Sequence, residues 1–265
     1  MSGARAAAAS QPVLLAGALA GLAVLAWAAL LAWEHSSLAH AMHVSALGAP
    51  SLECARPAPL AQAALYVGGW LLMTVAMMLP TAIPLANVFL RLTGRRADRV
   101  RLFALLVAGY LLAWLAFGIA AHAAHALAAR WAEGSGWLWS HPWVVPAATL
   151  ALAGAFQFSR LKQACLDECR SPLPFVVARW SGTAPRRDAL RLGIAHGVYC
   201  VGCCWALMLL MFTVGVGSVA WMLVLGAVMA VEKNAPWGRR IGAPLGVALL
   251  AAAAWVAYAG HAGLA

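Results

Sequence analysis

One stretch of the chain combines an imidazole, three thiols and two thioethers at helical spacing. With about 100° of rotation per residue, all six side chains fall within an arc of about 140° on one helix face. Soft sulfur ligands select soft ions such as Cu(I), zinc or the iron of iron–sulfur clusters. A bound metal would also neutralise thiolates that are costly to bury alone. The stretch therefore predicts a buried metal site made of His196, Cys200, Cys203, Cys204, Met208 and Met211.

A second pair of cysteines lies in the polar segment that precedes this stretch. Cys165 and Cys169 are four residues apart, so they share one face if the segment is helical. Short spacings of this kind are typical of metal-binding cysteine pairs. A structural disulfide is not expected, because the cytosol keeps thiols reduced. We expect Cys165 and Cys169 to belong to the same metal pathway.

Three further groups of side chains are candidates for metal or ion handling. Methionines one turn apart precede two prolines, which should kink their helix and free backbone carbonyls. A glutamate ends another apolar run, where it either pairs locally or handles an ion or proton. Histidines and a cysteine follow the first apolar run and could gather metal from outside. These candidates are Met73, Met77, Met78, Glu232, His40, His43 and Cys54.

The elements that must position these residues are apolar. The chain has 265 residues, of which 64% are hydrophobic and 10% are charged, whereas soluble domains have about 25% charged residues. Its mean hydropathy is +0.83. This composition excludes a soluble enzyme and a nucleic-acid reader. We expect the net charge of +10 to orient membrane segments rather than to bind nucleic acid.

Seven apolar runs predict an all-α, polytopic transmembrane helix bundle. A helix needs about 20 residues to cross a bilayer, and the sixth run is short, so six spans are the fallback. The first run is longer than the core of about 7–15 residues in a secretory signal, so we expect it to be retained. The runs are residues 13–33, 66–90, 102–129, 143–159, 192–216, 219–231 and 241–258.

The distribution of basic residues predicts the orientation of these spans. With a cytoplasmic N-terminus and seven alternating spans, all of the 18 basic residues except Arg56 and Arg130 lie on the inside. This is the asymmetry that the positive-inside rule describes. We therefore expect one integral-membrane domain over residues 1–265, surrounded by the lipid bilayer of the cytoplasmic membrane, with its C-terminus outside.

Several motifs resemble a bacterial family of predicted metal-binding integral membrane proteins, domain of unknown function 2182. The resemblance covers residues 65–235 and implies a metal-binding, multi-pass protein of the bacterial inner membrane. The family pattern has a Met-Asn pair where this chain has Gly217-Ser218, so any ligand from that pair is missing here. The motifs are Cys165-Leu-Asp-Glu-Cys169-Arg-Ser-Pro172, Gly197-Val-Tyr-Cys200-Val-Gly-Cys203-Cys204-Trp205, Glu232-Lys233 and Met73-Thr-Val-Ala-Met77-Met78-Leu-Pro80.

Handling or transport of a soft metal ion is the leading functional hypothesis. Copper(I) is the favoured metal and zinc is the other. The histidines of the outer segment would take up metal, the stretch from His196 to Met211 would hold it, and Cys165 with Cys169 would release it inside. The chain has no Gly-rich nucleotide-binding loop. Movement of metal would therefore depend on a gradient or on a partner such as a metallochaperone, and we expect no catalytic residue.

Other functions remain open. Cys200 and Cys203 form a C-x-x-C pair, which in a membrane thiol-disulfide oxidoreductase would cycle with a redox partner. Such exchange needs access for a partner thiol, which a site within the membrane disfavours. The cysteines could instead be small hydrophobic filler in a structural or assembly subunit. A haem enzyme is a further alternative, because His122, His125 and His196 lie in or near helices.

Overall fold

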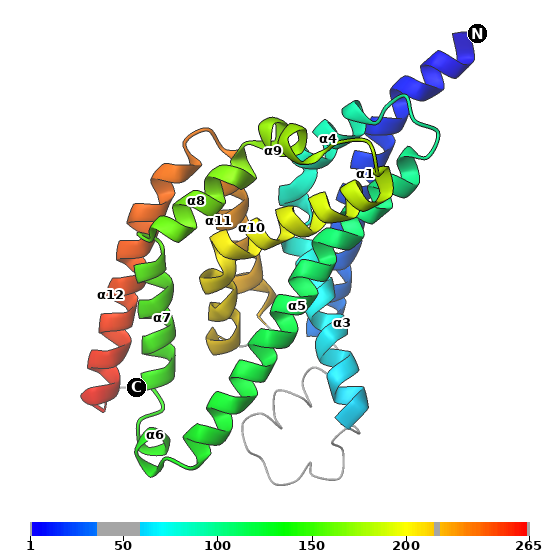
Figure 1. Cartoon of the computed structure of the whole chain (residues 1–265). Helices are drawn as coiled ribbons and strands as arrows, with labels where there is room; N and C mark the ends of the chain where they lie inside the picture. The colour runs from blue at the N-terminus through cyan, green and yellow to red at the C-terminus, as the bar shows by residue number, and fades with distance from the viewer. Residues whose placement is uncertain (1, 36–58, 215–217, 264–265) are drawn as a thin grey trace.

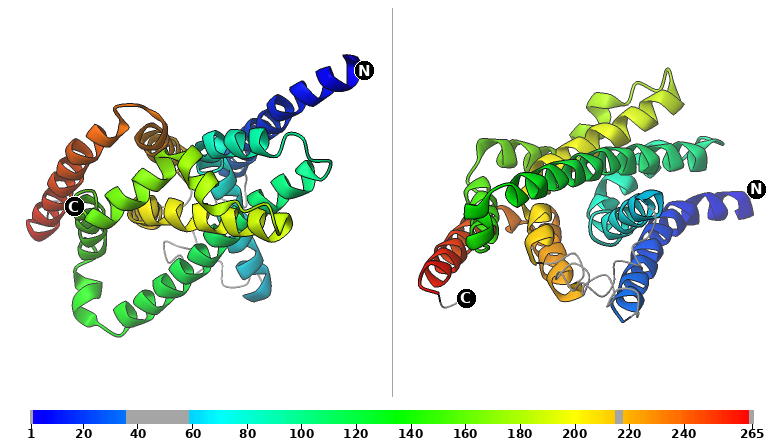
Figure 2. Two further views of the ribbon diagram at one scale, coloured as in Figure 1. Left: turned by 45° about the horizontal axis from the view of Figure 1, so that its top comes forward. Right: turned by 90° about the horizontal axis from the view of Figure 1, so that it is seen from below.

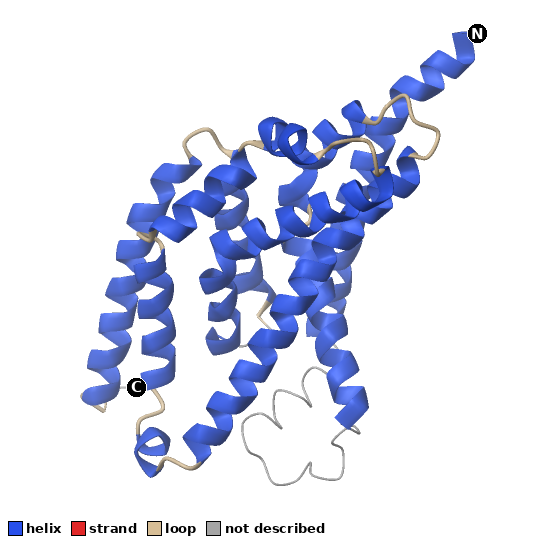
Figure 3. Cartoon of the chain, in the orientation of Figure 1, coloured by secondary structure: helices blue, strands red, loops and turns tan. Residues whose placement is uncertain are grey.

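The computed structural model describes residues 2–35, 59–214 and 218–263, and this part of the chain is helical without a strand (Figure 1, Figure 3). The predicted all-α class is therefore confirmed for the described residues. The elements are α1 (Ser2–Glu34), α3 (Pro59–Met77), η2 (Pro80–Ala82), α4 (Ile83–Leu92), α5 (Arg99–Glu133), α6 (Gly136–Ser140), α7 (Val144–Phe156), α8 (Arg160–Arg170), α9 (Pro172–Arg179), α10 (Pro185–Val214), α11 (Val219–Asn234), η3 (Gly238–Ile241) and α12 (Gly242–His261).

The long helices α5 and α10 cross at close range in the middle of the molecule (Figure 1). A Cβ atom at Gly197 would lie 2.6 Å from the Cβ of Ala113, and one at Gly109 would lie 2.9 Å from the amide nitrogen of Ile194. These distances leave no room for a side chain. The glycines therefore let the two backbones approach, as small residues do in membrane bundles, and this approach brings α10 against Tyr110 of α5.

The predicted kink at Pro80 is confirmed. The helix pair before and after this proline is bent by 45°, because proline has no amide hydrogen to continue the helical ladder. The Met78 carbonyl accepts hydrogen bonds from the hydroxyls of Thr81 at 2.7 Å and Tyr110 at 3.1 Å. The second bond crosses to α5, so the kink fixes the buried Met78 at the centre of the molecule.

Most of the polar segment between the apolar runs 143–159 and 192–216, where the sequence predicts no membrane span, is helical. Hydropathy misses α8 because its charged residues interrupt the apolar pattern, and it misses α9 because this helix has only 8 residues. Their start signals are local: the Ser159 side chain accepts a hydrogen bond from the Lys162 amide at 3.1 Å, and Pro172 opens α9, where a missing amide hydrogen is not needed. The α7–α8 pair is bent by 62°.

Among the described helices, four are long and apolar enough to cross a membrane: α1, α5, α10, and α12 counted together with η3. The bent pairs α3–α4 and α7–α8 would raise the number to six. The remaining predicted span corresponds to α11, which has only 16 residues. Seven spans thus stay a prediction. The N-terminus and the C-terminal end of α12 lie at opposite ends of the molecule (Figure 1), and α7 and α12 pack side by side at one edge (Figure 2).

Candidate metal centre

The three cysteines of α10 lie on a buried face of the helix. At most 2% of the surface of Cys200, Cys203 or Cys204 is exposed. The Cys203 and Cys204 thiols donate hydrogen bonds to the Cys200 carbonyl at 3.1 Å and 2.8 Å. These bonds use the sulfur-bound hydrogens, which each thiol must lose before its sulfur binds a metal as a thiolate. The predicted burial of this face is confirmed.

The first interhelical pair of sulfur atoms joins α8 to α10. Cys169 Sγ lies 4.0 Å from Cys203 Sγ, and Cys169 is the only described cysteine that is partly exposed. One turn earlier on α8, Cys165 packs against Gly202, where an added Cβ would lie 2.6 Å from the Cys165 sulfur. The two cysteine motifs therefore meet in the structure, and we call Cys169 and Cys203 the thiol pair.

The second pair joins α10 to the kink after α3. Cys204 Sγ lies 3.8 Å from the thioether sulfur of Met78, and both side chains are buried. The kink at Pro80 makes this contact possible, because it holds Met78 at the centre of the molecule. We call Cys204 and Met78 the thiol–thioether pair.

Lys233 of α11 lies among the sulfur atoms, and only 6% of its surface is exposed. Its ammonium group is 2.8 Å from Cys200 Sγ and 3.9 Å from both Cys204 Sγ and Met78 Sδ. The Tyr110 hydroxyl is 3.0 Å from Cys200 Sγ on another side. The sequence indicates Lys233 only as part of a family motif and gives no signal for Tyr110. Both contacts depend on how α5, α10 and α11 pack.

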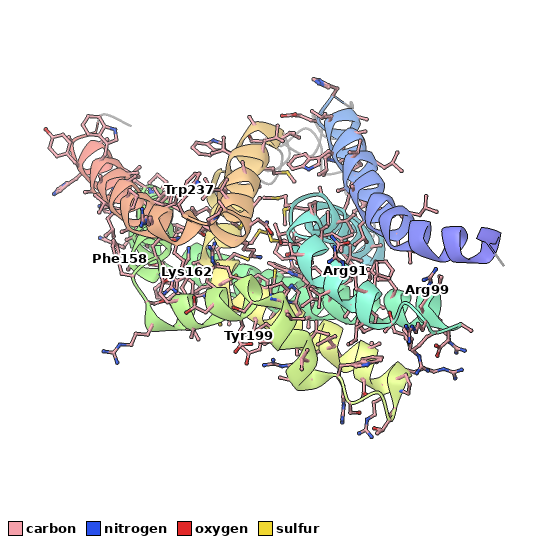
Figure 4. The ribbon with its side chains drawn as sticks, turned by 90° about the horizontal axis from the view of Figure 1, so that it is seen from above. Arg91, Arg99, Phe158, Lys162, Tyr199 and Trp237 are labelled. Carbon is pink, nitrogen blue, oxygen red and sulfur yellow. The ribbon has the colours of Figure 1, made fainter. Side chains whose placement is uncertain are left out.

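A buried ion pair joins α8 to α11 at Glu232, the residue next to Lys233 in the sequence. The Lys162 ammonium of α8 donates to both carboxylate oxygens of Glu232 at 2.8 Å and also to the side-chain oxygen of Gln157. Arg170 donates to the Glu232 carbonyl. Figure 4 shows the molecule from above, relative to Figure 1, and labels Lys162. Of the two roles left open for Glu232, the structure shows local pairing, and this pairing ties α11 to α8.

The other predicted ligands belong to neither sulfur pair or lie outside the described residues. The His196 ring packs on the rings of Tyr110 and Phe175, with centroids 5.7 Å and 5.5 Å away. Met208 and Met211 continue the buried face of α10, and Met73 and Met77 are buried on α3. A role of these five residues in metal binding stays a prediction. The candidates His40, His43 and Cys54 lie outside the described residues.

The side chains of this centre supply mainly sulfur ligands, and only a few of these ligands are available to any one ion. Nowhere in the described ranges do three His, Cys, Asp or Glu side chains form a group that could hold a metal ion. With metal–sulfur bonds of about 2.3 Å, the 4.0 Å between the sulfurs of the thiol pair corresponds to an angle of about 120° at one ion. Such a site suits a soft monovalent ion and lacks the four ligands of a structural zinc site.

One comparison with known proteins gives a match. The model of a family described as "PpoB2: Copper chaperone" matches residues 67–256. The matched range contains every residue of the thiol pair, the thiol–thioether pair and the two buried lysines. No curated protein and no solved structure matches the chain.

Proposed function

The chain belongs to the copper chaperone family whose model covers residues 67–256, and on this basis we propose that it is a membrane protein that carries Cu(I) on paired sulfur ligands. Family membership supports the predicted metal handling and copper as the metal, and it gives no support to zinc. The observation that carries the proposal is the meeting of sulfur atoms from α8, α10 and the kink after α3, with the thiol pair 4.0 Å apart and the thiol–thioether pair 3.8 Å apart.

The proposed mechanism is a series of ligand exchanges. Cys169 is partly exposed, so it is the first sulfur that a Cu(I) complex can reach, both for uptake and for the release predicted from the sequence, and Cys203 completes a two-sulfur site. From there the ion moves to the buried Cys200, Cys204 and Met78 as each new sulfur binds before the previous one leaves. Copper stays monovalent throughout, because each exchange replaces one metal–sulfur bond by another while a proton moves from the incoming thiol to the sulfur that leaves. Soft thiolate and thioether ligands favour this oxidation state.

The proposed location is the bacterial inner membrane. Support comes from the four apolar helices and two bent pairs that are long enough to cross it, and from the positions of the basic residues in the sequence. Resistance to alkaline carbonate extraction from the membrane fraction tests this part of the proposal, since a peripheral protein would be released into the supernatant.

The role of Cys169 as the first ligand predicts slow copper uptake by Cys169→Ser. The purified protein is mixed with Cu(I)–glutathione under anaerobic conditions, and bound copper is followed with time. We expect the uptake rate to fall at least about tenfold, which corresponds to about 1.4 kcal/mol in the barrier. The hydroxyl of serine is a poor ligand for a soft ion. Uptake at the wild-type rate would remove Cys169 from the pathway.

The matched control for this experiment is Ala164→Ser. Ala164 is exposed on the same helix, so this variant introduces the same hydroxyl without removing a sulfur. Its uptake rate should equal that of the wild type.

A further inference from the structure

The two buried lysines, Lys162 and Lys233, differ in how their charges are balanced. Lys162 faces the carboxylate of Glu232 at 2.8 Å from both oxygens. Lys233 instead faces Cys200, Cys204, Met78 and the Thr81 hydroxyl, the last at 3.5 Å. Among the ion pairs of the described residues, Lys162 has a partner and Lys233 has none. The sulfur atoms therefore share their buried site with one fixed positive charge.

The charge of the metal complex decides what this ammonium group does. Cu(I) bound by the thiolates of Cys200 and Cys204, the two cysteines that the Lys233 ammonium faces, has a net charge of minus one, and the ammonium makes the buried assembly neutral. A divalent ion on the same two thiolates is already neutral, so the ammonium leaves it with a net positive charge. Burial of an unbalanced charge is costly. The same lysine thus stabilises the monovalent complex and destabilises the divalent one.

On the basis of the proposed function, we propose that Lys233 is a specificity-determining residue, which makes the sulfur centre select monovalent over divalent metal ions. The selection acts through a fixed charge at 2.8 Å from a ligand sulfur, in addition to the preference of soft sulfur for Cu(I). Without this ammonium, the dithiolate complex of Cu(I) would keep a buried negative charge, and that of Zn(II) would be neutral.

The test compares Cu(I) and Zn(II) affinities of purified wild-type protein, Lys233→Met and Lys233→Arg, each by competition with a chelator of known affinity. For Lys233→Met we expect Cu(I) to bind about tenfold more weakly and Zn(II) about tenfold more tightly. The ratio of affinities then falls about a hundredfold, or about 2.8 kcal/mol. Lys233→Arg keeps the charge and should keep the ratio within a few-fold of the wild type.

The control removes a buried lysine without changing the net charge. The double variant Lys162→Met/Glu232→Met replaces both members of the ion pair, so its Cu(I)/Zn(II) ratio should equal that of the wild type. Lys233→Gln provides a second neutral variant that can still donate hydrogen bonds, and it should shift the ratio as Lys233→Met does. Monodisperse elution in detergent establishes that each variant is folded before its affinities are compared.

The possible outcomes distinguish failure of the role of Lys233 from failure of the proposed function. A wild-type ratio in the folded neutral variants, with Cu(I) still bound, overturns the role of Lys233 and leaves the copper site standing. Loss of selectivity in the control double variant would equally overturn it, because the effect would not follow the charge. If the wild type binds no Cu(I), both the proposed function and the inference fail.

Discussion

Replacing Cys200, Cys203 and Cys204 together by serine is expected to abolish stoichiometric Cu(I) binding by the purified protein. The triple variant removes one sulfur from the thiol pair, one from the thiol–thioether pair and the sulfur beside Lys233. The remaining sulfur atoms of the centre come from different elements and cannot form either pair. Affinity should fall by more than about a hundredfold, or about 2.8 kcal/mol. Metal content is measured by mass spectrometry after loading under reducing conditions.

Serine is the suitable replacement because its hydroxyl can still donate to the Cys200 backbone carbonyl, as the two thiols do at 3.1 Å and 2.8 Å. The control is Ala206→Ser, which adds a hydroxyl at a buried position of the same helix and should keep its copper. A triple variant that retains wild-type copper would show that α10 does not hold the metal. It would favour the structural-subunit alternative, in which the cysteines only fill space.

The second large effect concerns folding, and it is expected for Lys162→Met. This substitution leaves the Glu232 carboxylate buried without the ammonium group that now lies 2.8 Å from both of its oxygens. Loss of one partner from a buried ion pair costs about 3–5 kcal/mol, whereas replacement of both partners by apolar residues is often neutral. The free energy of unfolding in detergent should therefore fall by about that amount for Lys162→Met.

The double variant Lys162→Met/Glu232→Met should recover most of the lost stability, because it leaves no unpaired charge. Denaturant unfolding followed by tryptophan fluorescence measures both variants. If the single variant were as stable as the wild type, the ion pair would not tie α8 to α11. If the double variant were as unstable as the single one, lost packing rather than unpaired charge would explain the effect.

The sequence predicts those parts of the structure that depend on one helix at a time. Helical periodicity places Cys200, Cys203 and Cys204 on one face, and this face is buried. The helical spacing of Cys165 and Cys169 and the kink at Pro80 are local properties in the same sense. A run of apolar residues, however, reports only whether a helix suits a membrane interior. The apolar pattern therefore missed α8 and α9. The residues that begin these helices, Ser159 and Pro172, were the signal in the sequence that could have predicted them.

The sequence does not predict contacts between helices. A helical wheel gives the direction of a side chain about its own axis, but the partner depends on which helices pack together. Glu232 and Lys233 are adjacent, yet one faces Lys162 of α8 and the other faces Cys200 of α10. The wheel likewise places His196 on the buried face with the cysteines, but it does not show that the His196 ring packs on Tyr110 and Phe175. The separate roles of Glu232 and Lys233 follow from tertiary packing.

The most direct test of the central claim is copper K-edge X-ray absorption of the Cu(I)-loaded wild-type protein. The paired sulfurs of α8, α10 and the kink predict a first coordination shell of two or three sulfur atoms, without nitrogen or oxygen. A first shell dominated by nitrogen or oxygen would contradict the account.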